Sequence, residues 1–370
     1  MELSSEDALR LHVLLANKPL AIRIDEARMT LDALLLEGET QLQLHPNTRS
    51  DAYLRQVRAL LSERALGNPG GYPLYLQRWT RMGRMRDESL EQLLLLGEPS
   101  AVFAVVCAAG LTDELARRAW WAAEESENAR RMLATPEVVR GRMGPVLARH
   151  LVEHLPFESE TEKQIESVRM ALQPGLLEPA EVAALWQKSA RKPAFLVGFL
   201  AAIPDALPAE LPPHPALARA DEGLRALAAA GNPLAGLLLK ILSPAGQAFL
   251  DTCERVLNKP PTQDVVAATL DAMRTHLAPA RPEGAPDRTI EELSAEAATF
   301  AQSPAALAIL QRCEGLAPEV RALRTLSGLG YGVVRPVFRQ SSAIGTLMRS
   351  KLDPVLAPVR QQIAVLRGRA

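Results

Sequence analysis

The chain has 370 residues, with 42 lysines and arginines against 43 aspartates and glutamates and a formal net charge of -1. Hydrophobic residues make up 48% and charged residues 23%, which is typical of folded globular proteins and excludes disordered and collagen-like classes. The length allows two or three modules, each with a sizeable core.

The cysteines and the N-terminal residues indicate the compartment. Cys107, Cys253 and Cys313 are odd in number and far apart, so they form neither a disulfide framework nor a C-x-x-C pair. Acidic residues follow Met1 where a signal peptide has basic ones, and no uncharged run reaches the roughly 18 residues that span a bilayer. We therefore expect a cytoplasmic protein without a membrane span.

The first 46 residues are predicted to form a small α/β cap. The segment from Ser4 to Ala16 has helical spacing, with Ser4 or Ser5 as the N-cap ahead of acidic residues. Apolar and polar residues then alternate around 20–24, 29–33 and 42–44, and turn residues lie at 25–26 and 37–38. This pattern predicts a β-meander of two or three strands.

The pattern of residues 47–203 predicts a series of short helices interrupted by proline and glycine. Pro99, Pro136 and Pro179 each follow a leucine by three residues and precede a valine by three, at intervals of about 40 residues. An interval of that size with proline in the first helical turn is typical of two-helix solenoid repeats. We predict a mainly α fold, built as a short-helix solenoid-like array or as an irregular helical array.

The remaining chain is divided by two proline-rich segments. Five prolines within 204–215 predict a linker, and a second linker is expected at 279–288. Helical domains are predicted at 216–278 and at 289–370, with a helix over 233–257 bent at Pro244 and another over 290–310.

The last segment is strongly basic. Residues 321–370 hold nine basic side chains and one acid, Asp353, so the rest of the chain is acidic by about nine charges. Val355, Val359, Ile363 and Leu366 have the spacing of an amphipathic helix. We expect this helix to dock on the acidic remainder of the same chain, and the alternative is an arm that receives a partner.

One sequence motif points to metal chemistry. His150, Glu153 and His154 fit H-x-x-E-H, in which two imidazoles one helical turn apart bind zinc and the glutamate activates water. Both histidines fall on the predicted apolar stripe of their helix, and no third ligand stands out. We therefore favour packing histidines over a zinc hydrolase and expect neither a bound metal nor a cofactor.

Arginines interleave with aromatic residues in two stretches, as in proteins that stack bases and pair phosphates. The same residues also fit the solvated faces of helices, so binding to protein partners is favoured over binding to nucleic acid. The candidate interaction surface, with the basic residues of the C-terminal segment added, comprises Tyr75, Arg78, Trp79, Arg81, Arg84, Arg86, Arg117, Arg118, Trp120, Arg335, Arg339, Arg349 and Lys351.

Several phrases of the sequence resemble one protein family as a set. They are GNPGGYP at 67–73, RWTRMG at 78–83, LLLLGEP at 93–99, GLTDELARRAWW at 110–121, ENARRML at 127–133 and AIGTLMRSKLDPVLAP at 343–358. Together they resemble the DsrS family, cytoplasmic proteins encoded beside the reverse-acting dissimilatory sulfite reductase of sulfur-oxidising bacteria. The resemblance covers most of the chain and brings no catalytic motif with it.

The resemblance implies an accessory or regulatory role in sulfur oxidation. It does not imply sulfite reduction, since the chain lacks the clustered cysteines that iron-sulfur centres need. We therefore expect a non-enzymatic protein that contacts partners in the sulfur-oxidation machinery. The alternatives are an RNA-associated post-transcriptional regulator and, less favoured, the zinc hydrolase.

Overall fold

A computed structural model describes residues 3–67, 87–284, 287–339 and 345–369. The described chain is mainly helical, with a small three-stranded sheet near the N-terminus, which confirms the predicted fold class. It separates into two compact units, Met1–His154 and Leu155–Ala370. The division therefore falls inside the segment 47–203 that the sequence suggested as one domain.

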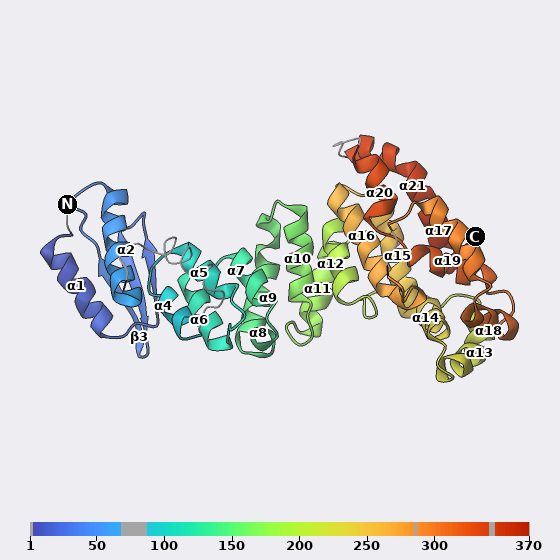
Figure 1. Cartoon of the computed structure of the whole chain (residues 1–370), viewed down its shortest axis with the longest axis horizontal. Helices are drawn as coiled ribbons and strands as arrows, with labels where there is room; N and C mark the ends of the chain where they lie inside the picture. The colour runs from blue at the N-terminus through green and yellow to red at the C-terminus, as the bar shows by residue number, and fades with distance from the viewer. Residues whose placement is uncertain (1–2, 68–86, 285–286, 340–344, 370) are drawn as a thin grey trace. The chain divides into compact units, whose positions relative to one another are not determined.

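The N-terminal module contains the segment 1–46, predicted as an α/β cap, together with the helix that follows it (Figure 1). Its elements are α1 (Ser5–Ala16), β1 (Ala21–Asp25), β2 (Thr30–Leu35), β3 (Gly38–Gln43) and α2 (Ser50–Leu66). The strands form an antiparallel meander in the order β1-β2-β3, with Ile22 opposite Ala33 and Leu31 opposite Leu42. The first turn forms because the Asp25 carboxylate accepts the backbone N–H groups of residues 27 and 28.

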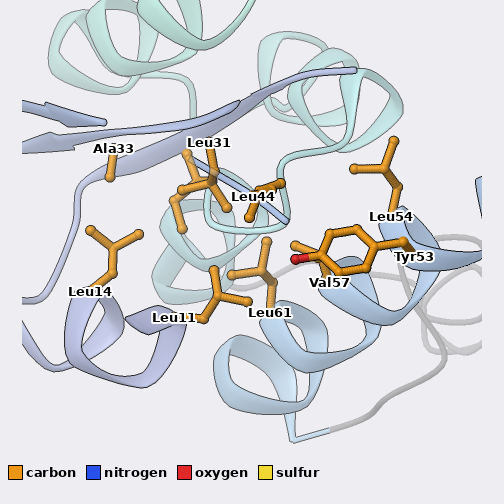
Figure 2. Close-up of a cluster of buried hydrophobic side chains, with 10 residues drawn as sticks. Leu11, Leu14, Leu31, Ala33, Leu44, Tyr53, Leu54, Val57 and Leu61 are labelled. Atoms are coloured by element: carbon orange, nitrogen blue, oxygen red, sulfur yellow. The ribbon is translucent and has the colours of Figure 1, made fainter. Parts of the chain in front are cut away.

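The core of this module lies between the sheet and the two helices (Figure 2). Period-two alternation turns Leu31 and Ala33 toward the helices, where they meet Leu11 of α1 and Leu61 of α2. A carboxylate is buried beside this core: Asp7 accepts hydrogen bonds from the Tyr53 hydroxyl at 2.5 Å and from the His45 backbone N–H at 3.1 Å. These two donors replace the water that the carboxylate loses on burial.

Short helices complete the first unit. They are α4 (Asp87–Leu93), α5 (Pro99–Val106), α6 (Asp113–Ala122), α7 (Ser126–Met132), α8 (Pro136–Arg140) and α9 (Met143–His154). Pro99 and Pro136 each occupy the first turn of a helix, as predicted. The helices that begin at Pro99, Pro136 and Pro179 have 8, 5 and 11 residues, so the three proline breaks do not start equal repeats.

The second unit is helical throughout its described residues. Its elements are the 3-10 turns η1 (Leu155–Phe157) and η2 (Ala278–Ala280) and the helices α10 (Thr161–Ala171), α11 (Pro179–Ser189), α12 (Pro193–Ala202), α13 (Leu217–Ala229), α14 (Pro233–Leu242), α15 (Pro244–Asn258), α16 (Gln263–His276), α17 (Ile290–Phe300), α18 (Pro304–Arg312), α19 (Ala317–Leu326), α20 (Tyr331–Phe338) and α21 (Gly345–Leu366). No helix or strand forms within the predicted linker 204–215.

Two predicted helices of this unit are interrupted. The bend expected at Pro244 is present, and it separates α14 from α15 by 73°. The single helix expected over 290–310 is wrong, because Ser303 caps a new helix: its hydroxyl accepts the backbone N–H of Ala306, and Pro304 occupies the first turn.

The basic C-terminal helix α21 packs against α15, α17 and α19 of its own unit. Its buried face consists of Met348, Leu352, Leu356, Val359, Ile363 and Leu366. Docking within the chain therefore occurs as expected, although Leu356 rather than Val355 points inward. Beyond the helix, Arg367 is buried and pairs with Asp251, at 2.6 Å, and with Glu254 of α15.

A second buried ion cluster lies beside α19. The Arg324 guanidinium pairs with Glu283 and Glu296, donates to the carbonyl of Ala280 at 2.7 Å, and lies 4.3 Å from the Phe300 ring centroid. The neighbouring Arg281 is also buried and pairs with Glu296 at 2.9 Å. The cluster joins the segment after η2 to α17 and α19.

Among the described residues, no single helix has both the length and the apolar composition to cross a membrane. The bent pair α14 and α15 meets those criteria only when its two helices are taken together.

Candidate functional site

The first candidate site lies at the end of α9, and α6 positions that helix. The Asp113 carboxylate, in the first turn of α6, accepts the backbone N–H groups of Arg142 and Met143 at 3.0 Å each. These are donors that the start of a helix leaves unsatisfied. Gly141 makes the approach possible, since a Cβ there would lie 2.0 Å from the Asp113 carboxylate.

This cap brings His150 of α9 against Trp120 of α6. The two rings meet edge to face, with centroids 4.6 Å apart and planes at 81°. Trp120 is 8% exposed and His150 is half-buried. The structure thus brings together two residues that the sequence assigned to different candidate sites.

His154 stacks on the outer side of His150. The ring centroids lie 3.8 Å apart with planes at 21°, and the His154 Nδ1 donates to the His150 carbonyl at 2.9 Å. Glu153 and His154 are both exposed, so the expectation that both histidines lie on the buried apolar stripe of their helix is wrong for His154. The reason is that the buried stripe of α9 runs through Met143, Leu147 and Leu151, while Val146 is 45% exposed.

The paired rings are poorly arranged for a metal. The lone pair that binds a metal lies in the plane of the imidazole ring. In two stacked rings the lone pairs lie in nearly parallel planes and do not converge on one ion. No group of three or more histidine, cysteine, aspartate or glutamate side chains that could hold a metal ion occurs within the described ranges. His150, Glu153 and His154 therefore remain a sequence motif without an assembled set of ligands in the described chain.

A serine that the sequence reasoning missed lies beside His150. The Ser126 Oγ, at the start of α7, is 3.3 Å from His150 Nε2, an arrangement that a nucleophile and its base adopt. Burial and the charge of the adjacent His154 lower the pKa of His150 to about 4, against the opposing effect of Glu153. An imidazole of that pKa is a weak base near neutrality, so His150 is poorly suited to activate the Ser126 hydroxyl as a nucleophile.

The arginines of α6 are engaged by acids. Arg117 donates to the Glu114 carboxylate at 2.7 Å and Arg118 at 2.9 Å, while Arg118 also reaches Glu91 at 3.5 Å. The hydrogen bond from Arg117 is the main cause that lowers the pKa of Glu114 to about 2. With Trp120 buried, this face presents neither a free arginine fork nor a stacking ring.

A second contact that the sequence did not predict joins α6 to the sheet. The Arg23 guanidinium of β1 lies 4.5 Å from the centroid of the Trp121 ring and donates to the Trp121 carbonyl at 3.1 Å. This contact fixes α6 against the sheet.

The predicted basic residues of the C-terminal segment lie on α20, after it, and on α21. Arg335 pairs with Asp287, and Arg349 donates to the Thr346 hydroxyl at 2.9 Å. Arg339 is exposed just after α20, and Lys351 is exposed on α21. Arg324 and Arg367 are the more deeply buried arginines of this region, and no local pattern marks them because their acidic partners are distant along the chain.

The remaining predicted surface residues lie outside the described part of the chain. They are Tyr75, Arg78, Trp79, Arg81, Arg84 and Arg86.

Comparisons with protein families, with curated proteins and with solved structures returned no match for this chain.

Proposed function

We propose that this protein is a non-enzymatic accessory or regulatory protein of cytoplasmic sulfur oxidation that acts by binding other proteins of that machinery. The resemblance of several sequence phrases to the DsrS family supports the pathway. The chemistry of the candidate site supports a role without catalysis, because the His150 imidazole is a weak base and stacks on His154.

An exposed apolar spot on α1 supports the protein-binding part of the proposal. On the outer side of α1, Leu9 is 66% exposed and Val13 is 57% exposed, one helical turn apart. Side chains four residues apart on a helix lie next to each other, so the two form one apolar spot while Leu11 and Leu14 face the core. Apolar anchors at this spacing are the feature through which helices dock on protein partners.

Affinity capture of the full-length protein from sulfur-oxidising cells, with and without nuclease, tests this proposal. We expect proteins of the sulfur-oxidation machinery to be recovered in both conditions. The double variant Leu9→Ser/Val13→Ser should weaken their binding about thirtyfold, since each of the two lost apolar anchors costs about 1 kcal/mol. The matched control is Val146→Ser, an exposed apolar residue of α9.

Recovery that disappears with nuclease would favour the RNA-associated alternative. Recovery that is unchanged in the double variant would show that the outer face of α1 is not the binding surface.

A further inference from the structure

Two cavities open beside α1 and α2 in the N-terminal module. The larger, of about 890 Å³, has residues of both helices in its wall, and the smaller, of about 440 Å³, lies where α1 ends. His12 and Arg64 line both cavities, so they adjoin. Each volume is in the range of sites for small organic ligands.

The floor of the smaller cavity is apolar. Leu15 and Leu95 are half-buried and pack against the hydrophobic core of the module, and Pro19 is buried. The cavity thus reaches the outer layer of a well-packed core. An apolar ligand body resting there would be removed from water without displacing a protein side chain.

The rim of the smaller cavity is cationic. Lys18, Arg64 and His12 line it, and its lining within the described chain includes no aspartate or glutamate. On the same two helices, Arg10 pairs with Glu6 and Arg58 with Glu26. Among the described residues, no acidic side chain pairs with Lys18 or Arg64, and both residues are exposed at the cavity.

Two local features prepare this rim for an anion. The His12 Nδ1 contacts the Ala8 carbonyl at 2.7 Å, which makes Nδ1 the donor and leaves Nε2 for another partner. Lys18 has φ +52°, a left-handed conformation that glycine and asparagine adopt more easily than lysine. Lys18 follows the end of α1, where a left-handed residue is common, but a lysine incurs a strain there that glycine does not.

We propose that the smaller cavity binds a small amphipathic organic anion, with its acidic group at Lys18 and Arg64 and its apolar body on Leu15 and Leu95. This binding goes beyond the proposed protein-partner function and uses a different surface from the Leu9 and Val13 spot. Carboxylates and sulfonates share the required chemistry, since both pair with guanidinium and ammonium groups.

Calorimetric titration of the full-length protein with decanoate, a medium-chain carboxylate, tests the proposal. We expect decanoate to bind. Decanol carries the apolar chain without the charge and acetate carries the charge without the chain, so decanol and acetate should each bind far more weakly than decanoate. Arg64→Gln and Lys18→Asn should each weaken decanoate binding about fivefold or more, the effect of losing one charge-assisted contact. The control Arg55→Gln removes an exposed arginine of α2 that does not line the cavity and should change nothing.

Lys18→Asn separates binding from folding. Asparagine tolerates the left-handed conformation, so this variant should melt at the same temperature as the wild type or higher while binding decanoate less well. The proposal is overturned if the wild type does not bind decanoate, if decanol binds equally well, or if the two variants bind decanoate as tightly as the control. Binding only to anionic phospholipid vesicles would also contradict it.

Discussion

The arginines of α6 in the first unit and two buried arginines of the second unit form different kinds of ion pair. On α6 in the first unit, Arg117 and Arg118 pair with Glu114 over three and four residues, at the surface. In the second unit, Arg324 and Arg367 pair with acids 28 to 116 residues away and are buried. A basic stretch of sequence therefore does not by itself indicate a nucleic-acid surface, because burial and ion pairing determine whether each charge is available to a ligand.

The largest expected effect comes from removing the end of α21. Deletion of residues 354–370 takes away Leu356, Val359, Ile363 and Leu366, each stabilising the fold by about 1.5–3 kcal/mol when buried. It also leaves Asp251 and Glu254 without Arg367. We expect the melting temperature of the second unit to fall sharply and binding of the dye ANS to rise.

Removal of residues 369–370 alone is the control, since Arg369 is exposed and its contact with Glu254 is long, at 3.8 Å. If the 354–370 deletion melts like the wild type and binds no additional dye, the segment is free in the isolated protein and acts as a partner-binding arm.

The next effect is expected at a single buried arginine. Arg324→Ala leaves the Ala280 carbonyl without its donor and Glu296 with fewer cations, in a site where the arginine side chain is only 7% exposed. Removing one partner of a buried pair typically costs about 3–5 kcal/mol. Calorimetric unfolding measures this loss, and Arg321→Ala, one turn earlier on the exposed side of α19, should cost little. Equal losses of stability in both variants would contradict the conclusion that the buried arginine stabilises the fold more than the exposed one.

A smaller, pH-dependent effect is expected in the N-terminal module. Burial raises the pKa of Asp7. Hydrogen bonds from Tyr53 and His45 together lower the pKa by more than burial raises it, so it lies below its ordinary value. The carboxylate therefore contributes its full stability above about pH 4, and this contribution is lost as the pH falls through the lowered pKa.

Tyr53→Phe tests that contribution. A hydrogen bond to a charged group is worth about 1.5–3 kcal/mol, so the variant should be less stable at pH 7, with a smaller further loss on acidification. Tyr331→Phe is the control, because that tyrosine is 52% exposed. If Tyr53→Phe loses as much stability on acidification as the wild type, Asp7 does not set the pH dependence of stability.

The smallest effect is expected at the surface pairs of α6. Arg117→Ala should change the free energy of unfolding by less than about 0.5 kcal/mol, and 1 M salt should remove most of that difference. Thermal melts at low and high salt measure it. A loss comparable to that of Arg324→Ala would mean that local exposed pairs stabilise the fold as much as buried long-range ones.

Local patterns in the sequence were enough to predict the β-meander and the limits of the first helix. The alternation through Leu31 and Ala33 and the turn at Asp25 are short-range signals, as is Pro244 at the bend between α14 and α15. The sequence also predicted docking of the last helix, though its buried face is set by the helices against which it packs.

The contacts at the candidate site could not be predicted in the same way. His150 meets Trp120 only because Asp113 caps a helix that begins 30 residues later, and Gly141 leaves room for that cap. The partners of Arg324 and Arg367 likewise depend on tertiary packing. No local periodicity carries such information.

Site-specific photo-crosslinking in sulfur-oxidising cells tests the proposed protein-binding role most directly. A photoreactive phenylalanine analogue at position 9, on the exposed apolar spot of α1, is compared with the same analogue at position 157, where the native Phe157 is 83% exposed in the second unit. We predict that position 9 gives a discrete adduct with a protein of the sulfur-oxidation machinery and that position 157 gives none. No adduct at position 9, or an adduct only with RNA, would contradict a function through protein contacts at this surface.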